Sequence, residues 1–225
     1  MTFAVATSET AAVAGVLTAA FSGDPMMVWL FPDRATHVAA LGTWWRYLTE
    51  RRPPDAELWM TDDGASAALW QAPRIDEPPP DDRNSAGSGE SRSRPSELLD
   101  VDEDRDRFVE GEDRDPFIEM VGGLVGDRLP IVLDMFARLR DAHPAELHWY
   151  LPAVGTIPAM QGRGSGRRVL MPVLDRCDSD GLPAYLESSN PRNVPFYLRL
   201  GFEVTGDITT ADGGATLTGM WRRPR

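Results

Sequence analysis

The stretch of sequence that decides the fold is Gln161-Gly162-Arg163-Gly164-Ser165-Gly166, which follows an aromatic, strand-like run and opens a helical pattern. Glycine lets the backbone adopt positive φ and lets a ligand approach without a Cβ in the way. The first amides of a helix have no intrahelical acceptor, and the helix dipole adds partial positive charge there. The turn therefore predicts a cradle for a pyrophosphate group. Glycines also serve tight strand-to-helix connections, so the turn alone is weak support for that function.

Two arginines next to the glycines favour the same ligand. Arg163 and Arg167 can add charge-assisted hydrogen bonds to phosphate oxygens. The stretch is not a P-loop, which needs a lysine, because all 23 basic residues of the chain are arginine. The same absence excludes a Schiff-base lysine. A Rossmann site that binds ribose has an acidic residue about 20 positions after its glycine turn. Glu187 lies 21 residues after Gly166, so that alternative stays open at this point.

Strands and helices alternate along the rest of the chain. Thr7 and Ser8 offer caps to the first helix, and Gly23-Asp24-Pro25 breaks it. Strands that alternate with helices over the second half predict a mixed α/β sheet covered by helices, in one domain over residues 1–225. Apolar periodicity and turn residues predict, in chain order, a strand at 3–6, helices at 12–21 and 38–48, strands at 57–61 and 66–71 joined by a hairpin turn, helices at 117–122 and 131–139, a strand at 148–157, a helix with its apolar stripe at 169–177, a strand at 184–188, a helix at 194–200, and strands at 202–207 and 216–221.

Residues 76–115 differ in composition from everything around them. These 40 residues hold 15 acidic side chains, 6 arginines and only 6 hydrophobic residues. Such a segment cannot bury enough apolar surface to offset chain ordering, which costs about 1–2 kcal/mol per residue. We expect an acidic, mobile insertion, and the alternative is a lid or docking element that orders with a ligand. The segment carries −9 of the net charge of −12, which leaves −3 on the other 185 residues.

The overall composition argues against several classes of partner and site. A net charge of −12 opposes binding to nucleic acid or to an anionic membrane surface. The single cysteine, Cys177, excludes an internal disulfide framework and a cysteine-rich zinc site, so we expect no metal and a reducing compartment. The longest apolar run, 11–21, is shorter than the roughly 20 residues that span a bilayer, and no basic residues precede it as in a secretory signal. We therefore expect a cytoplasmic protein.

The glycine turn belongs to a longer pattern. Gln161-x-x-Gly164-x-Gly166 follows a strand that contains Val154-Gly155-Thr156, and Leu186-Glu187-Ser188, Asn193 and the run 196–202 come after it. This pattern resembles the acetyl-CoA core of the GNAT superfamily of N-acetyltransferases, and 148–204, 58–73 and 220–224 are most similar to its puromycin-acetylating branch. The resemblance implies an α/β (α+β) fold with a mixed, mostly antiparallel sheet of about seven strands, in which one parallel pair splays apart, flanked by helices.

The resemblance also implies a cofactor site for acetyl-CoA. It assigns Val154, Gly155 and Thr156 to backbone contacts with the pantetheine arm. An amide near Ala153 or Val154 would polarise the thioester carbonyl. The pyrophosphate is assigned to the turn, with residues Gln161, Gly162, Arg163, Gly164, Ser165 and Gly166, and to Arg167. Asn193 is either the cap of the helix at 194–200 or a cofactor contact, and both roles are compatible.

Tyr197 and Glu187 are the expected catalytic residues. The resemblance places Tyr197 near the thioester sulfur, where a phenol with a pKa of about 10 can donate a proton to a thiolate whose thiol has a pKa of about 8.5. Glu187 is the first candidate for the base or for the group that positions water; alternatively it only orders neighbouring amides. His148, Glu146 and Asp33 are weaker candidates for the base.

The expected acceptor is a primary amine of a small molecule, such as a puromycin-like aminonucleoside or another antibiotic, and this would make the protein an antibiotic-resistance enzyme. The amine attacks the acetyl carbonyl directly while both substrates are bound. Two alternatives stay open: an acetyltransferase that modifies a protein N-terminus or side chain, and a non-catalytic CoA-binding sensor. The protein is expected to be a monomer or a homodimer.

Overall fold

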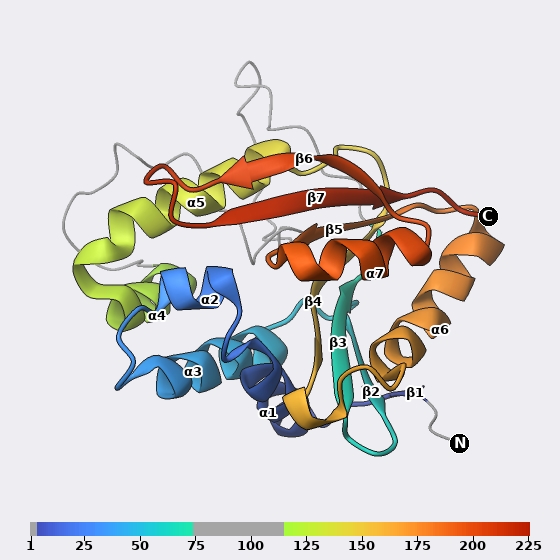
Figure 1. The fold of residues 1–225 in the computed structure, drawn as a ribbon, viewed down its shortest axis with the longest axis horizontal. Coiled ribbons are helices and arrows are strands. Elements are labelled where there is room, and N and C mark those ends of the chain that lie inside the picture. Colours follow the sequence, from blue (N-terminus) through green and yellow to red (C-terminus); the bar gives the residue numbers. More distant parts are fainter. Residues whose placement is uncertain (1–3, 74–114) are drawn as a thin grey trace, which may run out of the picture.

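A computed structural model of the protein describes residues 4–73 and 115–225. The acidic insertion expected at 76–115 therefore lies, except for Asp115, outside the described residues. The described residues form one seven-stranded sheet in the order β1-β2-β3-β4-β5-β7-β6 (Figure 1). The strands are β1 (Ala4–Ala6), β2 (Glu57–Thr61), β3 (Ser66–Gln71), β4 (Trp149–Thr156), β5 (Ala184–Ser188), β6 (Glu203–Thr209) and β7 (Thr216–Arg222).

The sheet is mixed and mostly antiparallel. Five of its neighbouring pairs are antiparallel, and β4 and β5 form the parallel pair. This confirms the predicted fold class. The helices are α1 (Thr10–Phe21), α2 (Pro25–Leu30), α3 (His37–Glu50), α4 (Pro116–Val125), α5 (Leu129–Ala142), α6 (Ser165–Asp180) and α7 (Val194–Arg199).

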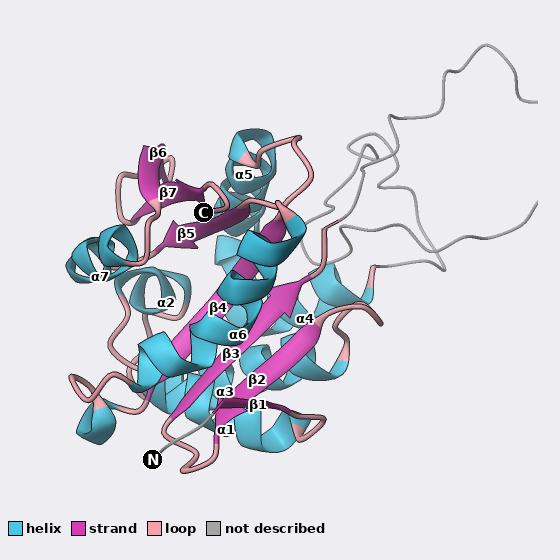
Figure 2. Cartoon of the chain, turned by 90° about the vertical axis from the view of Figure 1, so that its right-hand side faces the viewer, coloured by secondary structure: helices cyan, strands magenta, loops and turns pink. Residues whose placement is uncertain are grey.

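Two apolar cores lie on the two faces of the sheet. Side chains of a strand alternate between faces, so Leu69 packs in one core with residues of α1 to α5, whereas Trp70 packs in the other with residues of α6 and α7. Figure 1 shows α1 and α6 on opposite sides of β3 and β4, and Figure 2 shows α2 and α7 next to each other. Cys177 lies fully buried in the α6 core, and burial raises the pKa of its thiol to about 12, as expected for a packing residue.

The break predicted at Gly23-Asp24-Pro25 is also the start of a helix that the sequence prediction missed. Asp24 Oδ1 accepts hydrogen bonds from the amides of Met26 and Met27 at 3.0 and 3.3 Å. Pro25 occupies the first helical position, where no amide hydrogen is needed. α1 therefore ends at Phe21, and Asp24 and Pro25 begin α2.

Two helix ends differ from prediction. Neither Thr7 nor Ser8 caps α1, which starts at Thr10 after Glu9 without a side-chain cap; Thr7 Oγ1 instead accepts from the Glu9 amide at 3.0 Å. The helix predicted at 117–122 continues to Val125, because the residue that leaves helical geometry is Gly126, with φ of +54°. Among the described residues, no helix is both long and apolar enough to cross a membrane.

Candidate functional site

β4 and β5 pair only where they begin. Trp149 lies opposite Ala184 and Tyr150 opposite Tyr185, and the described register contains no later pair. Beyond that point β4 stays paired with β3 and β5 with β7, to the end of each strand. Within the described residues, the main-chain groups on the facing edges of 151–156 and 186–188 therefore have no strand partner, as expected for strands that splay apart.

A β-bulge redirects β4 at the same level. Between two paired positions, β3 supplies Trp70 alone whereas β4 supplies Leu151 and Pro152. Proline has no amide hydrogen to donate to a ladder, so it suits a bulge. The extra residue shifts the alternation, so that Leu151 packs in the α6 core whereas Ala153 packs in the α1 core. The bulge thus sets the direction of the amides near Ala153 and Val154, one of which is expected to polarise the thioester carbonyl.

The glycine turn has the backbone geometry that requires glycine. Gly162 and Gly164 have φ of +76° and +82°, in the left-handed region. α6 begins at Ser165, and its first main-chain bond runs from the Arg168 amide to the Gly164 carbonyl at 3.1 Å. The amides of residues 165–167 therefore have no intrahelical acceptor, and the capping residue is a glycine without a side chain to satisfy them.

Thr156 ties this turn to the sheet. Gln161 Nε2 donates to the Thr156 carbonyl at 3.2 Å, and Thr156 Oγ1 lies 2.7 Å from Ser66 Oγ. A Cβ on Gly166 would lie 3.4 Å from Thr156 Oγ1 and 3.6 Å from Phe196 Cζ. The start of α6 thus meets the end of β4 and the first turn of α7, which brings three of the predicted cofactor segments together.

Arg168 is a residue of this turn that sequence reasoning missed. Its Nη2 donates to the Arg163 carbonyl at 3.2 Å and to Ser165 Oγ at 2.9 Å. Its Nε is buried without a hydrogen-bond partner in the described part of the chain. Arg163 and Arg167 are exposed. The spacing from Ser165 to Arg168, one helical turn, is the sequence signal that identifies it.

Gly155 has a packing role that the sequence does not show. A Cβ at this position would lie 2.5 Å from Ala20 Cβ and 3.3 Å from Leu17 Cδ2, both on α1. Glycine is needed there because α1 packs directly on the backbone of β4. Val154, the preceding residue, packs against the opposite core.

Asn193 does not cap the helix that carries Tyr197. The side chain of Asn190 accepts from the Arg192 amide at 3.1 Å and caps the 3₁₀ turn Pro191–Asn193, whereas Asn193 makes no side-chain cap and is exposed. The cap role considered for Asn193 is therefore wrong, because the 3₁₀ turn moves the cap three residues upstream.

Tyr197 is buried, with 7% of its surface exposed, and it lies near a carboxyl group that sequence reasoning missed. Burial first, and then the negative charge of Asp24, raises the pKa of Tyr197 well above its ordinary value. The near match between phenol and thiol expected from ordinary pKa values does not hold in this environment. Tyr197 stays protonated and is suited to donating a hydrogen bond.

Glu187 lies in a buried polar cluster. The Tyr150 hydroxyl donates to Glu187 Oε2 at 2.8 Å, and burial together with the Glu187 charge raises the pKa of Tyr150. The Glu187 side chain is 4% exposed, and its Oε1 lies 3.7 Å from His143 Nδ1. Neither of these two atoms has a hydrogen-bond partner in the described ranges. His143 Nε2 lies 3.1 Å from His148 Nε2, so His143 joins two of the predicted candidates.

Of the other two weak candidates, Glu146 meets this cluster through its main-chain carbonyl, which contacts His148 Nδ1, and Asp33 lies in a separate turn. Asp33 is exposed, and its carboxylate accepts from the Ala35 amide and the Thr36 hydroxyl within its own turn, both at 3.0 Å. Glu146 lines a groove of 690 Å³ together with Pro183 and the C-terminal segment, at the beginning of β5 rather than at the splayed end. Neither position suits a base for chemistry between the splayed strands.

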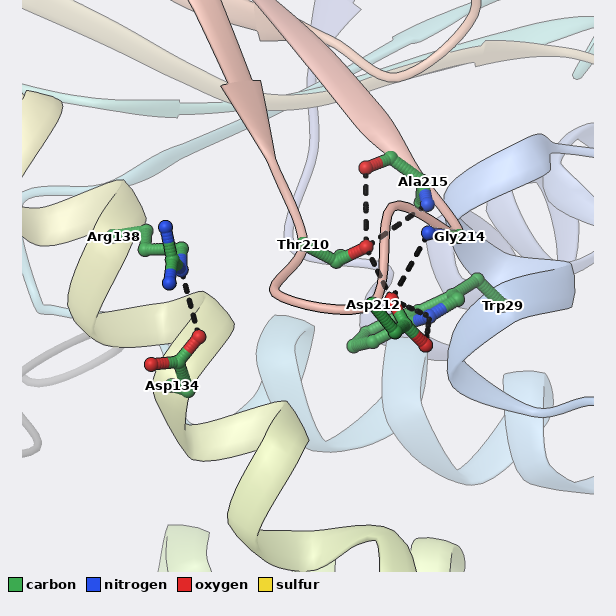
Figure 3. A network of polar contacts seen from close by, with 7 residues as sticks. All are labelled: Trp29, Asp134, Arg138, Thr210, Asp212, Gly214 and Ala215. Atoms are coloured by element: carbon green, nitrogen blue, oxygen red, sulfur yellow. Dashed lines mark hydrogen bonds and ion pairs between the residues drawn. The ribbon is translucent and has the colours of Figure 1, made fainter.

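α2 is fixed to the β6–β7 hairpin by the network drawn in Figure 3. Trp29 Nε1 donates to Asp212 Oδ1 and Oδ2 at 3.2 and 3.0 Å, and Asp212 also accepts from the Thr210 hydroxyl at 2.6 Å and the Gly214 amide at 3.0 Å. The Thr210 bond first, then those of Gly214 and Trp29, lower the pKa of Asp212 to about 2. The Arg128 guanidinium donates to the Trp29 carbonyl at 2.7 Å. The network holds in place α2, the helix that Asp24 caps.

Comparison with known proteins places the chain in a family. Residues 67–202 match the model of the acetyltransferase (GNAT) family. A stretch of 77 residues is 43% identical to an uncharacterised N-acetyltransferase of Schizosaccharomyces pombe and covers 33% of this chain and 30% of that protein.

Two solved structures share the fold. A crystal structure from Corynebacterium glutamicum, described as histone acetyltransferase HPA2 and related acetyltransferase, is 21% identical with a TM-score of 0.61 and covers 100% of this chain and 97% of its own. The C-terminal condensation domain of Ebony in complex with beta-alanyl-dopamine is 15% identical with a TM-score of 0.55 and covers 99% of both chains. The matched region spans the splayed strands, the glycine turn and the helix of Tyr197, and the chain belongs to the acetyltransferase (GNAT) family.

Proposed function

We propose that the protein transfers the acetyl group of acetyl-CoA to a primary amine of a small molecule, by direct attack with both substrates bound. The observation that carries the proposal is the separation of β4 from β5 after Tyr150 and Tyr185. The uncapped start of α6 follows the end of β4, and the helix of Tyr197 follows the end of β5. Because parallel strands end at one edge of a sheet, both features lie at the splayed end. Membership of the GNAT family supports the same activity.

The residues present fit acetyl-CoA. The unpaired amides of residues 165–167 and the guanidinium of Arg168 suit a pyrophosphate, because they supply donors and positive charge at a helix N-terminus. Exposed Arg163 and Arg167 add charge at the rim. The unpaired strand edges suit the amides of the pantetheine arm, to which the main chain of 154–156 would pair as to another strand. Bound there, acetyl-CoA supplies an activated acetyl group.

Tyr197 and Glu187 have proposed roles in proton handling. The protonated phenol of Tyr197 donates a hydrogen bond to the sulfur as the carbon–sulfur bond breaks, which favours departure of the thiolate. Glu187 takes the proton of the amine or positions the water that does so; its Oε2 is held by Tyr150, and its Oε1 faces His143 Nδ1 at 3.7 Å. Asn193, exposed beside this helix and not engaged in capping, is available to the cofactor.

The acceptor we propose is a puromycin-like aminonucleoside or another amine antibiotic, because 148–204 resembles the puromycin-acetylating branch of the family. A role in antibiotic resistance follows from that acceptor. We propose a cytoplasmic location, since the single cysteine, Cys177, is buried and unpaired, as in proteins of reducing compartments.

The test combines binding and turnover. The full chain is titrated with acetyl-CoA by calorimetry and then incubated with acetyl-CoA and a panel of amines: puromycin, phenethylamine, and a peptide with a free N-terminus and a lysine. Release of free thiol measures turnover, and mass spectrometry identifies the acetylated product. The proposal predicts saturable binding and acetylation of a small amine.

Other outcomes select the alternatives. Acetylation of the peptide alone would indicate a protein acetyltransferase, and tight binding without turnover of any amine would indicate a CoA-binding sensor. No binding of acetyl-CoA would refute the proposed function altogether.

A further inference from the structure

Asp24 is a buried carboxyl group at the point where α1 gives way to α2, with 7% of its surface exposed. Its Oδ2 accepts the hydroxyl of Ser189 at 2.6 Å, and Ser189 directly follows β5. Its charge also acts on the buried phenol of Tyr197. One carboxyl group thus joins the α1–α2 connection, the splayed end of β5 and the helix that carries Tyr197.

Capping of α2 does not account for this arrangement. Asp115 followed by Pro116 begins α4 in the same way, with Oδ1 accepting the Phe117 amide at 2.8 Å, and Asp115 is exposed. Capping therefore needs neither burial nor the second carboxylate oxygen. In Asp24, Oδ1 serves both amides of α2, and Oδ2 is turned to the end of β5.

Asp24 has no cationic partner among the described residues. The pKa of Asp24 is set by burial and by hydrogen bonds from the Ser189 hydroxyl and the amides of Met26 and Met27. Burial is the largest of these and raises the pKa of Asp24 above its ordinary value. Buried carboxylates are normally paired with a cation, because removal of a charge from water is costly. The site is therefore complementary to a cation that the described residues do not supply.

We propose that Asp24 receives the acceptor: its carboxylate binds the ammonium form of a cationic primary amine and takes one proton from it before the nitrogen attacks the thioester. The inference rests on the proposed function and names the chemical class of its acceptor. It leaves Glu187 as the residue that positions water.

The proton and electron balance closes without another reactant. An N–H bond of the ammonium breaks, its electron pair stays on nitrogen, and an O–H bond forms on Asp24. The nitrogen bonds to the acetyl carbon, and the carbon–sulfur pair leaves with sulfur. The proton that the new amide nitrogen loses neutralises the thiolate next to Tyr197. Asp24 returns its proton to solvent when the product leaves.

The test compares two amines of nearly the same shape. Phenethylamine is a cation at neutral pH, whereas the fluorines of 2,2-difluoro-2-phenylethylamine withdraw electrons and leave most of its amine neutral. Asp24→Asn keeps the cap and removes the charge. It should lower kcat/KM for phenethylamine by about 100-fold or more, the usual range for a lost general base, and lower it much less for the difluoro amine. Affinity for acetyl-CoA, measured by calorimetry, should not change.

Asp115→Asn is the matched control, because it alters the same Asp-Pro cap at an exposed site, and it should leave both rates as they are. Ser189→Ala removes a hydrogen bond that lowers the pKa of Asp24, so the acid limb of the rate profile for phenethylamine should move to higher pH. Equal losses for both amines in Asp24→Asn, or an unmoved acid limb in Ser189→Ala, would overturn the inference.

Failure of the inference and failure of the proposed function are distinguishable. An Asp24→Asn variant that acetylates phenethylamine as fast as the wild type contradicts the inference and leaves the function standing. Wild-type protein that binds acetyl-CoA and acetylates neither amine contradicts the inference. Wild-type protein that binds no acetyl-CoA contradicts both.

Discussion

The contact between Gly155 and α1 provides the sharpest test of how the splayed strand is supported. In Gly155→Ala, the new Cβ would lie 2.5 Å from Ala20 Cβ, whereas carbon atoms attract best at about 3.5–4.0 Å. α1 or β4 must therefore move by about 1 Å or more. Overpacking of this kind costs about 1–3 kcal/mol. For a chain of this size, each kcal/mol lowers Tm by about 2–4 °C, so we expect a fall of about 2–12 °C.

Gly15 supplies a matched control in the same helix. It lies in the exposed middle of α1, and a Cβ there would meet nothing within 4 Å. Gly15→Ala should raise the free energy of unfolding by about 0.5–1 kcal/mol, because glycine is a poor helix former. Thermal unfolding followed by circular dichroism measures both variants. If Gly155→Ala melts at or above the temperature of the wild type, the close contact between α1 and β4 is refuted.

Three further predictions concern the cofactor, the leaving group and the hairpin. Arg168→Gln should weaken acetyl-CoA binding in calorimetry, with a larger loss at low salt, and equal affinity would remove Arg168 from the phosphate site. Tyr197→Phe should lower turnover by about 10²-fold, the lower end for a lost proton donor, while acetyl-CoA affinity stays the same; an unchanged rate would contradict its role. The pKa of Asp212 is lowered to about 2 from 3.8, so its stabilising contribution is complete above about pH 4 and is lost as the pH falls toward 2. Acid unfolding followed by tryptophan fluorescence should show this loss in the wild type and not in Asp212→Asn, and identical acid profiles would contradict it.

Local sequence was sufficient for the glycine turn and the helix that follows it. Gly162 and Gly164 adopt left-handed backbone that other residues avoid, and apolar positions from Val169 onward repeat at helical spacing. Both signals lie within a few residues of the structure they determine, so the pattern predicts it. The same holds for the parallel pair, because the family resemblance rests on residues within β4 and β5 themselves.

Features that depend on distant contacts could not be predicted. Asp24-Pro25 is equally suited to ending a helix and to beginning one. The partner of Asp24 Oδ2 is Ser189, which lies 165 residues away in the sequence. The packing role of Gly155 depends on α1, which is distant in the sequence. His143 lies outside every motif and reaches Glu187 only because α5 ends next to β5.

The central claim is that acetyl-CoA binds between the splayed strands with its pyrophosphate at the start of α6. Amide hydrogen exchange, followed by mass spectrometry with and without acetyl-CoA, tests this position directly. We predict that acetyl-CoA slows exchange in peptides that contain 151–156 and 164–168, while 149–150 and 184–185, already paired with each other, change little. Unchanged exchange in both segments at saturating acetyl-CoA, or protection confined to other parts of the chain, would contradict the account.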